Sequence, residues 1–86
     1  MSEDRIPAEI FHPSEFIIEE MAARGWTSLD LSSMAVMPLT ELQGILAGGP
    51  LLAHHAERLA VAFGTSPQLW ANLWMAYKKY AAMRER

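Results

Sequence analysis

The sequence predicts an all-α domain built from five helices. Three observations support this fold class. Apolar residues recur at helical spacing, glycines and prolines divide the chain into five segments, and the links between segments are very short. A length of 86 residues fits one domain. We therefore expect an N-terminal arm over residues 1–11 and a single helical domain over residues 12–86.

The first expected helix covers residues 13–24. Pro13 suits the first helical turn, because its missing N–H costs nothing there, and Gly25 supplies a C-terminal stop. The apolar positions that fit a helical period are Phe16, Ile17, Met21 and Ala22. Glutamates occupy the other face, where we expect them to be solvated.

The second and third expected helices lie close together in the sequence. Thr27 is a good N-cap with Asp30 three residues on, and the second helix should end near Ala35. Its expected buried side consists of Leu29, Leu31 and Met34. Pro38 suits position N1 of the third helix, which should end at Gly48. The third helix has a stripe of Leu39, Leu42, Ile45 and Leu46. Two helices joined by so short a turn fit a helix-turn-helix.

The fourth and fifth expected helices are bounded by the same kinds of start and stop residues. The fourth covers residues 53–63 and stops at Gly64, with Ala56, Leu59, Ala60 and Phe63 facing inward. Ser66 should cap the fifth helix and Pro67 should open it. This helix runs to the low eighties, and its stripe is Trp70, Leu73, Trp74 and Tyr77.

Composition narrows the class of protein. The chain has no cysteine, which excludes disulfides and thiolate metal sites. No apolar run approaches the roughly 20 residues that span a bilayer, and the charged start has no signal-peptide core, so we expect a cytoplasmic protein. The formal net charge is −3, which makes the positions of the seven basic residues important for any DNA-binding role.

Several motifs resemble HigA-type antitoxins of the Cro/repressor-like (XRE-like) superfamily. They are His12-Pro13-Ser14-Glu15, Gly25-Trp26-Thr27, Met37-Pro38-Leu39, Ile45-Leu46-Ala47-Gly48 and, most specifically, the block over residues 56–73. The resemblance implies a five-helix Cro/repressor-like fold and a component of a type II toxin–antitoxin system. Such proteins are homodimers that bind a palindromic operator, repress their own operon and partner a RelE-like mRNA-cleaving toxin.

With this resemblance, five residues are candidates for DNA binding. They are Thr27, Ser28, Thr40, Gln43 and Gly44. A glutamine pairs bidentately with adenine, a threonine contacts a thymine methyl, and helix N-termini donate to phosphates. No lysine or arginine lies between Arg24 and Arg58, however. Flanking contacts are therefore expected from Arg5, Arg24, Lys78 and Lys79.

Two functions remain open at this point. The first is a dimeric, DNA-binding autorepressor that also acts as an antitoxin. The second is a helix-turn-helix-derived protein-interaction module that has lost DNA binding. The second reading rests on the missing basic residues beside Leu39 and Met37, which we expect to be exposed.

The aromatic residues of the last expected helix can serve either core packing or contact with a partner. Tryptophan and tyrosine fill cores, and they also concentrate in interface hot spots. We expect Trp70 to be buried, with Trp74 and Tyr80 nearer a subunit contact. The candidate partner or dimer interface is Trp70, Trp74, Tyr77 and Tyr80.

Metal binding and catalysis find little support in the residues. His54 and His55 are adjacent, and neighbours in a helix point in different directions, so we expect no joint chelation and no metal. Both should be solvated at the start of the fourth helix. Ser32 and Ser33 lack a glycine-rich elbow, and no phosphate loop is present. We expect no enzymatic activity and no cofactor.

Overall fold

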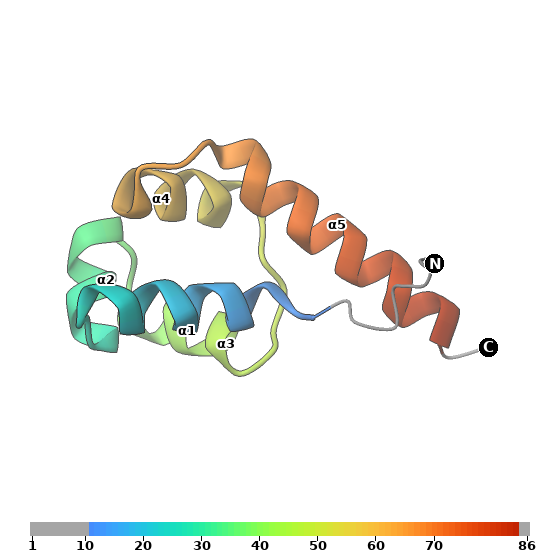
Figure 1. The fold of residues 1–86 in the computed structure, drawn as a ribbon, viewed down its shortest axis with the longest axis horizontal. Helices are drawn as coiled ribbons and strands as arrows, with labels where there is room; N and C mark the ends of the chain where they lie inside the picture. Colours follow the sequence, from blue (N-terminus) through green and yellow to red (C-terminus); the bar gives the residue numbers. More distant parts are fainter. Residues whose placement is uncertain (1–10, 85–86) are drawn as a thin grey trace.

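A computed structural model describes residues 11–84 of the chain, with side chains through residue 83. Within this range the chain forms five helices and no strand (Figure 1). They are α1 (Pro13–Arg24), α2 (Ser28–Ala35), α3 (Leu39–Leu46), α4 (Ala53–Phe63) and α5 (Pro67–Arg84). This confirms the predicted fold class. Most of the expected arm lies outside the described residues. None of the described helices is long and apolar enough to cross a membrane.

The helix ends follow the capping signals in the sequence. Thr27 and Asp30 form the predicted capping box: the Asp30 N–H donates to Thr27 Oγ1 at 3.2 Å, and the Thr27 N–H donates to Asp30 Oδ2 at 2.9 Å. Ser66 Oγ accepts the Leu69 N–H at 3.3 Å at the start of α5. One boundary shifts, because Pro38 is the N-cap of α3 and not its first helical residue.

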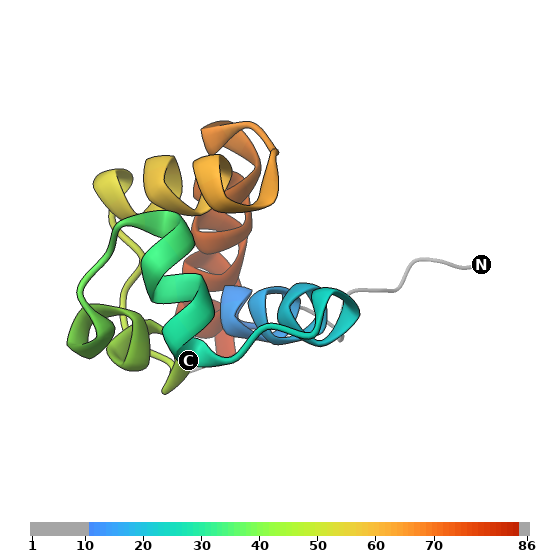
Figure 2. The same ribbon diagram turned by 90° about the vertical axis from the view of Figure 1, so that its left-hand side faces the viewer.

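Each helix packs against two others, so that the five helices contact one another in a closed ring. α2 contacts both α3 and α4, and α1 contacts α3 and α5. α4 packs along the first part of α5, whose far end extends away from the other helices (Figures 1 and 2). The short link over residues 36–38 places α2 against α3, as a helix-turn-helix requires.

The core lies between the five helices. Its buried apolar side chains are Ile17, Met21, Leu31, Ala35, Met37, Leu42, Ile45, Leu51, Ala56, Leu59, Ala60, Phe63 and Trp70. Two expectations are wrong here. Leu29 and Met34 are 66% and 50% exposed, because α2 buries the face that carries Leu31 and Ala35. Met37 is only 4% exposed, so it packs in the core and offers no surface to a partner.

His12 connects three parts of the chain that are distant in sequence. Its Nδ1 accepts the Ser14 N–H at 3.0 Å and so caps α1. This leaves the proton on Nε2, which donates to the carbonyl of Gly49 at 2.8 Å. The ring also lies edge-on to Trp74 and Tyr77, at centroid distances of 5.6 and 5.0 Å. The start of α1, the link after α3 and the middle of α5 therefore meet at one side chain.

We expect His12→Ala to lower the free energy of unfolding by about 3 kcal/mol, as the sum of a lost cap, a lost hydrogen bond and lost ring contacts. His12→Asn keeps a capping oxygen and should recover about 1 kcal/mol of this loss. Urea unfolding followed by circular dichroism measures both. The exposed His54→Ala is the control, and a His12→Ala loss no larger than that of the control would contradict this role.

The turn between α2 and α3 contains a strained residue. Val36 has a φ of 52°, in the left-handed region that β-branched residues rarely occupy. The Val36 N–H donates to Ser33 O at 3.2 Å, and the Met37 N–H donates to Ser32 O at 3.0 Å. The side chain of Val36 is 67% exposed, so it gains little from burial. The backbone pairing of the turn thus holds a residue that its own conformation disfavours.

Val36→Asn should therefore stabilise the domain by about 1 kcal/mol, since asparagine tolerates the left-handed conformation. Thermal and urea unfolding measure the gain. Val61→Asn is the matched control, because Val61 is similarly exposed, at 73%, but lies inside α4. The strain assignment fails if Val36→Asn gives no gain over this control.

Candidate nucleic-acid interface

The N-terminus of α2 presents backbone donors beside two candidate residues. Thr27 is exposed, and Ser28 is half-buried at the first position of the helix. The capping box uses the N–H groups of Thr27 and Asp30. The N–H groups of Ser28 and Leu29 have no acceptor among the described residues. They lie at the positive end of the helix dipole. These two groups are available to an anion, although the Asp30 carboxylate lies close by.

The outward face of α3 is neutral. Thr40, Gln43 and Gly44 are all exposed and lie three and four residues apart, which places them on one side of the helix. Leu42 and Ile45 are buried on the opposite side. Leu39 is half-buried against the core, so the expectation of an exposed leucine at this face is wrong. The structure brings three of the five candidate residues together on one surface.

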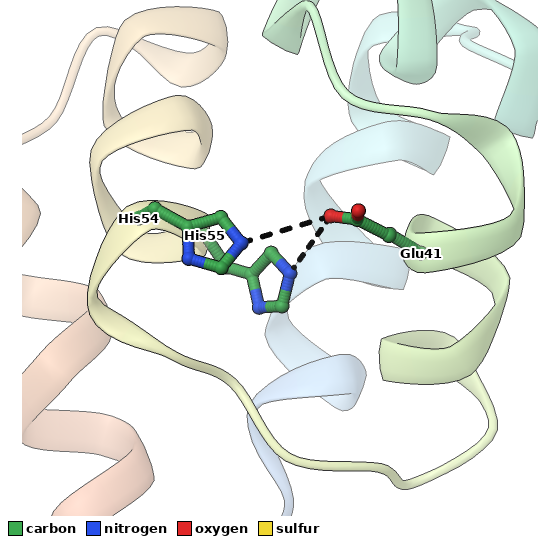
Figure 3. A group of neighbouring side chains, drawn as sticks. All are labelled: Glu41, His54 and His55. Atoms are coloured by element: carbon green, nitrogen blue, oxygen red, sulfur yellow. Dashed lines mark hydrogen bonds and ion pairs between the residues drawn. The ribbon is translucent and has the colours of Figure 1, made fainter.

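Glu41 lies beside this face and points toward the start of α4. Figure 3 shows its carboxylate facing both His54 and His55. Glu41 Oε1 lies 3.1 Å from His55 Nε2 and 3.7 Å from His54 Nε2. The negative charge of α3 is therefore turned toward two imidazoles at the start of α4.

This cluster corrects two expectations about the histidines. His55 is buried at 7% exposure, because its Nδ1 folds back to accept the Leu52 N–H at 3.0 Å and so caps α4. His54 remains exposed, and the two rings lie 4.1 Å apart, so adjacent positions do not point apart here. The first turn of a helix has few preceding backbone atoms to restrict side-chain direction. Glu41, the third member, is thirteen residues from His54 in the printed sequence and is invisible to helical periodicity.

The expected flanking cation Arg24 is already engaged in the fold. Its guanidinium forms an ion pair with Glu20 and donates from Nη2 to the Phe63 carbonyl at 3.3 Å. It also lies over the rings of Trp26 and Phe63, at 5.5 and 5.0 Å from their centroids. Arg5 lies outside the described residues. Over residues 27–46, which hold α2 and α3, the charged side chains are Asp30 and Glu41 alone.

The aromatic residues of α5 divide into two kinds. Trp70 is 1% exposed and donates from Nε1 to Thr65 Oγ1 at 2.8 Å. The expectation that Trp70 contributes to an interface is therefore wrong, since it belongs to the core. Trp74 and Tyr77 are half-buried and stack on each other, with ring centroids 5.9 Å apart. Tyr80 is also half-buried. Contact of these three with a partner stays a prediction.

Solved structures provide relatives for this fold. No family model and no curated protein matches the sequence. An addiction module antidote protein of a HigA family from Coxiella burnetii is 32% identical, with a TM-score of 0.82 over 88% of this chain and 85% of that chain. The antitoxin GraA is 27% identical, with a TM-score of 0.83 over 88% and 84% of the two chains.

A third structure extends the likeness in fold. It is described as an antidote protein of a plasmid maintenance system from Nostoc punctiforme. It shares 22% identity with this chain, with a TM-score of 0.82 over 87% of this chain and 84% of that one. At this identity the match supports the arrangement of helices. The fold is thus shared across sequences that have diverged widely.

Proposed function

Because the chain belongs to the HigA family of addiction-module antidote proteins, we propose that it is the antitoxin of a type II toxin–antitoxin system. In this role it neutralises a RelE-like toxin, binds operator DNA as a dimer and represses its own operon. The observation that carries the proposal is the family match along most of both chains, together with an accessible helix-turn-helix. The function of each surface follows from its chemistry.

Base reading falls to the neutral face of α3. The Gln43 amide can pair with an adenine edge, and the Thr40 methyl can contact a thymine. Gly44 adds no side chain, and a Cβ there would meet nothing within 4 Å, so DNA can approach the helix closely. The N–H groups of Ser28 and Leu29, which have no acceptor among the residues that the structure describes, supply phosphate contacts without a formal charge.

Phosphate neutralisation falls to residues outside α2 and α3. Arg58 and Lys79 are exposed on α4 and α5, and Lys78 is exposed with its Nζ 5.9 Å from the Trp74 ring centroid. The acidic groups near α3 oppose binding, which makes the orientation of Glu41 toward the histidines favourable. A dimer doubles the number of available cations and matches a two-fold operator.

We expect Gln43→Ala to weaken binding to operator DNA by about 5- to 150-fold, the range for one bidentate base contact. Fluorescence anisotropy with the chain's own upstream DNA, at about 50–100 mM salt, measures the loss, and binding should weaken as salt rises. Gln68→Ala is the matched control, because Gln68 is exposed on α5 and bonds only to Asn72 among the described residues. Equal affinities of the two variants would contradict base reading by Gln43.

A second candidate function follows from the lack of cations at α2 and α3. In this function the scaffold acts as a protein-interaction module that has lost DNA binding and still neutralises its toxin. An acidic chain suits a basic partner, since opposite charges speed association and favour the correct pairing. Flat anisotropy curves at micromolar protein, combined with a stable toxin complex, would favour this function over the first.

Co-expression with the toxin encoded by the adjacent gene should restore growth, and the two proteins should co-elute in size-exclusion chromatography. Because the attraction is partly electrostatic, we expect association to slow as salt increases. A HigA-family antitoxin from a different toxin–antitoxin pair, co-expressed with the same toxin, serves as the specificity control. Absence of both rescue and complex would refute the antitoxin function in either form.

A further inference from the structure

We propose that Glu41, His54 and His55 bind a divalent transition-metal ion of the zinc class at the junction of α3 and α4. The three side chains come from two helices and converge on one point (Figure 3). This inference goes beyond the antitoxin function and requires neither DNA nor toxin. It rests on the positions of three ligand atoms and on the chemistry of an imidazole–carboxylate donor set.

The spacing of the ligand atoms fits one ion. The distances from Glu41 Oε1 to the two Nε2 atoms are 3.1 and 3.7 Å. One ligand atom from each of the three residues lies within 4.8 Å of the other two. Zinc–ligand bonds of about 2.0–2.2 Å in a tetrahedron place neighbouring ligand atoms about 3.4 Å apart. Small rotations of the exposed Glu41 and His54 side chains therefore complete the geometry. Their exposure also provides a path of entry from solvent.

The donor set selects the kind of ion. Two imidazoles and one carboxylate suit zinc, copper or nickel, whereas magnesium and calcium prefer oxygen ligands alone. Three protein ligands leave a fourth position for water. The third histidine of the sequence does not compete, because both ring nitrogens of His12 are engaged with Ser14 and Gly49. A bound ion would cross-link the recognition helix to α4 and reverse the sign of charge beside α3.

His55 gives the site a recognisable signature. Its Nδ1 now accepts the Leu52 N–H, so the proton is on Nε2 and faces Glu41. Coordination through Nε2 requires the proton to move to Nδ1, which breaks the bond to Leu52. Leu52 is 49% exposed, so water can accept the released N–H. We expect this exchange to weaken the ion's affinity by roughly fivefold and to speed hydrogen exchange at the Leu52 amide.

The test uses the full, tag-free chain after treatment with a chelator. Calorimetry with Zn²⁺ should show one ion per chain, and Co²⁺ should give the visible absorption of a tetrahedral site. Saturating Zn²⁺ should raise Tm by at least about 4 °C, whereas Mg²⁺ should not change it. Glu41→Gln and His54→Gln should each weaken Zn²⁺ binding at least tenfold. Glu19→Gln, an exposed change on α1, is the control that keeps binding.

Three results would overturn the proposal. The first is no heat and no Tm change with Zn²⁺ at a hundredfold excess over protein. The second is equal Zn²⁺ affinity in Glu41→Gln, His54→Gln and the parent chain, which would place the ion elsewhere. The third is an unchanged Leu52 exchange rate in the zinc-loaded protein, which would exclude His55 as a ligand. None of these results bears on toxin or DNA binding, so a failure here is separable from a failure of the antitoxin function.

Discussion

The arrangement of helices depends on the buried ring of His12. Its two nitrogens serve the start of α1 and the link after α3, while its edges contact two aromatic residues of α5. Two backbone hydrogen bonds also hold the link after α3: the Gly49 N–H donates to the Gly44 carbonyl at 2.9 Å, and the Gly48 N–H donates to the Ile45 carbonyl at 3.0 Å. A Cβ on Gly49 would lie 2.7 Å from the Gly44 carbonyl oxygen, so the approach requires glycine. Together with the buried Leu42 and Ile45, the imidazole of His12 and the small residue Gly49 therefore hold α3 in its orientation against α1.

The residues that stabilise the fold are distinct from those of α3 that would contact DNA. The core, the caps and the aromatic packing of α5 do not use the outward face of α3, so that face is free to change. Here it carries threonine, glutamine and glycine. The neighbouring Glu41 faces His54 and His55 at the start of α4. Arg24, which is well placed in the sequence for a phosphate, instead stabilises the end of α4 through Phe63. In the proposed function, DNA affinity therefore comes from the N-terminus of α2 and from cations on α4 and α5.

Local sequence signals predicted the five helices. The features that they did not predict depend on contacts between helices. Thr27, Ser66 and the helix-ending glycines act within a few residues, so their effects are readable from sequence. The burial of Met37 and the exposure of Leu29 depend on how α2 is rotated against α3 and α4, which periodicity over eight residues does not fix. The Glu41 cluster joins two helices through a bend in the chain and leaves no local pattern. The proposed interface residues of α5 remain a prediction, because aromatic spacing is the same for core and partner contacts.

We propose that the neutral outward face of α3 and the N-terminus of α2 contact operator DNA. Amide chemical shifts of the ¹⁵N-labelled chain, recorded while operator DNA is added, test this directly at each residue. We expect the largest shifts at Ser28, Leu29, Thr40, Gln43 and Gly44, with smaller ones near Lys78 and Lys79. Shifts confined to other surfaces, or no shifts at concentrations well above those of specific operator binding, would contradict it.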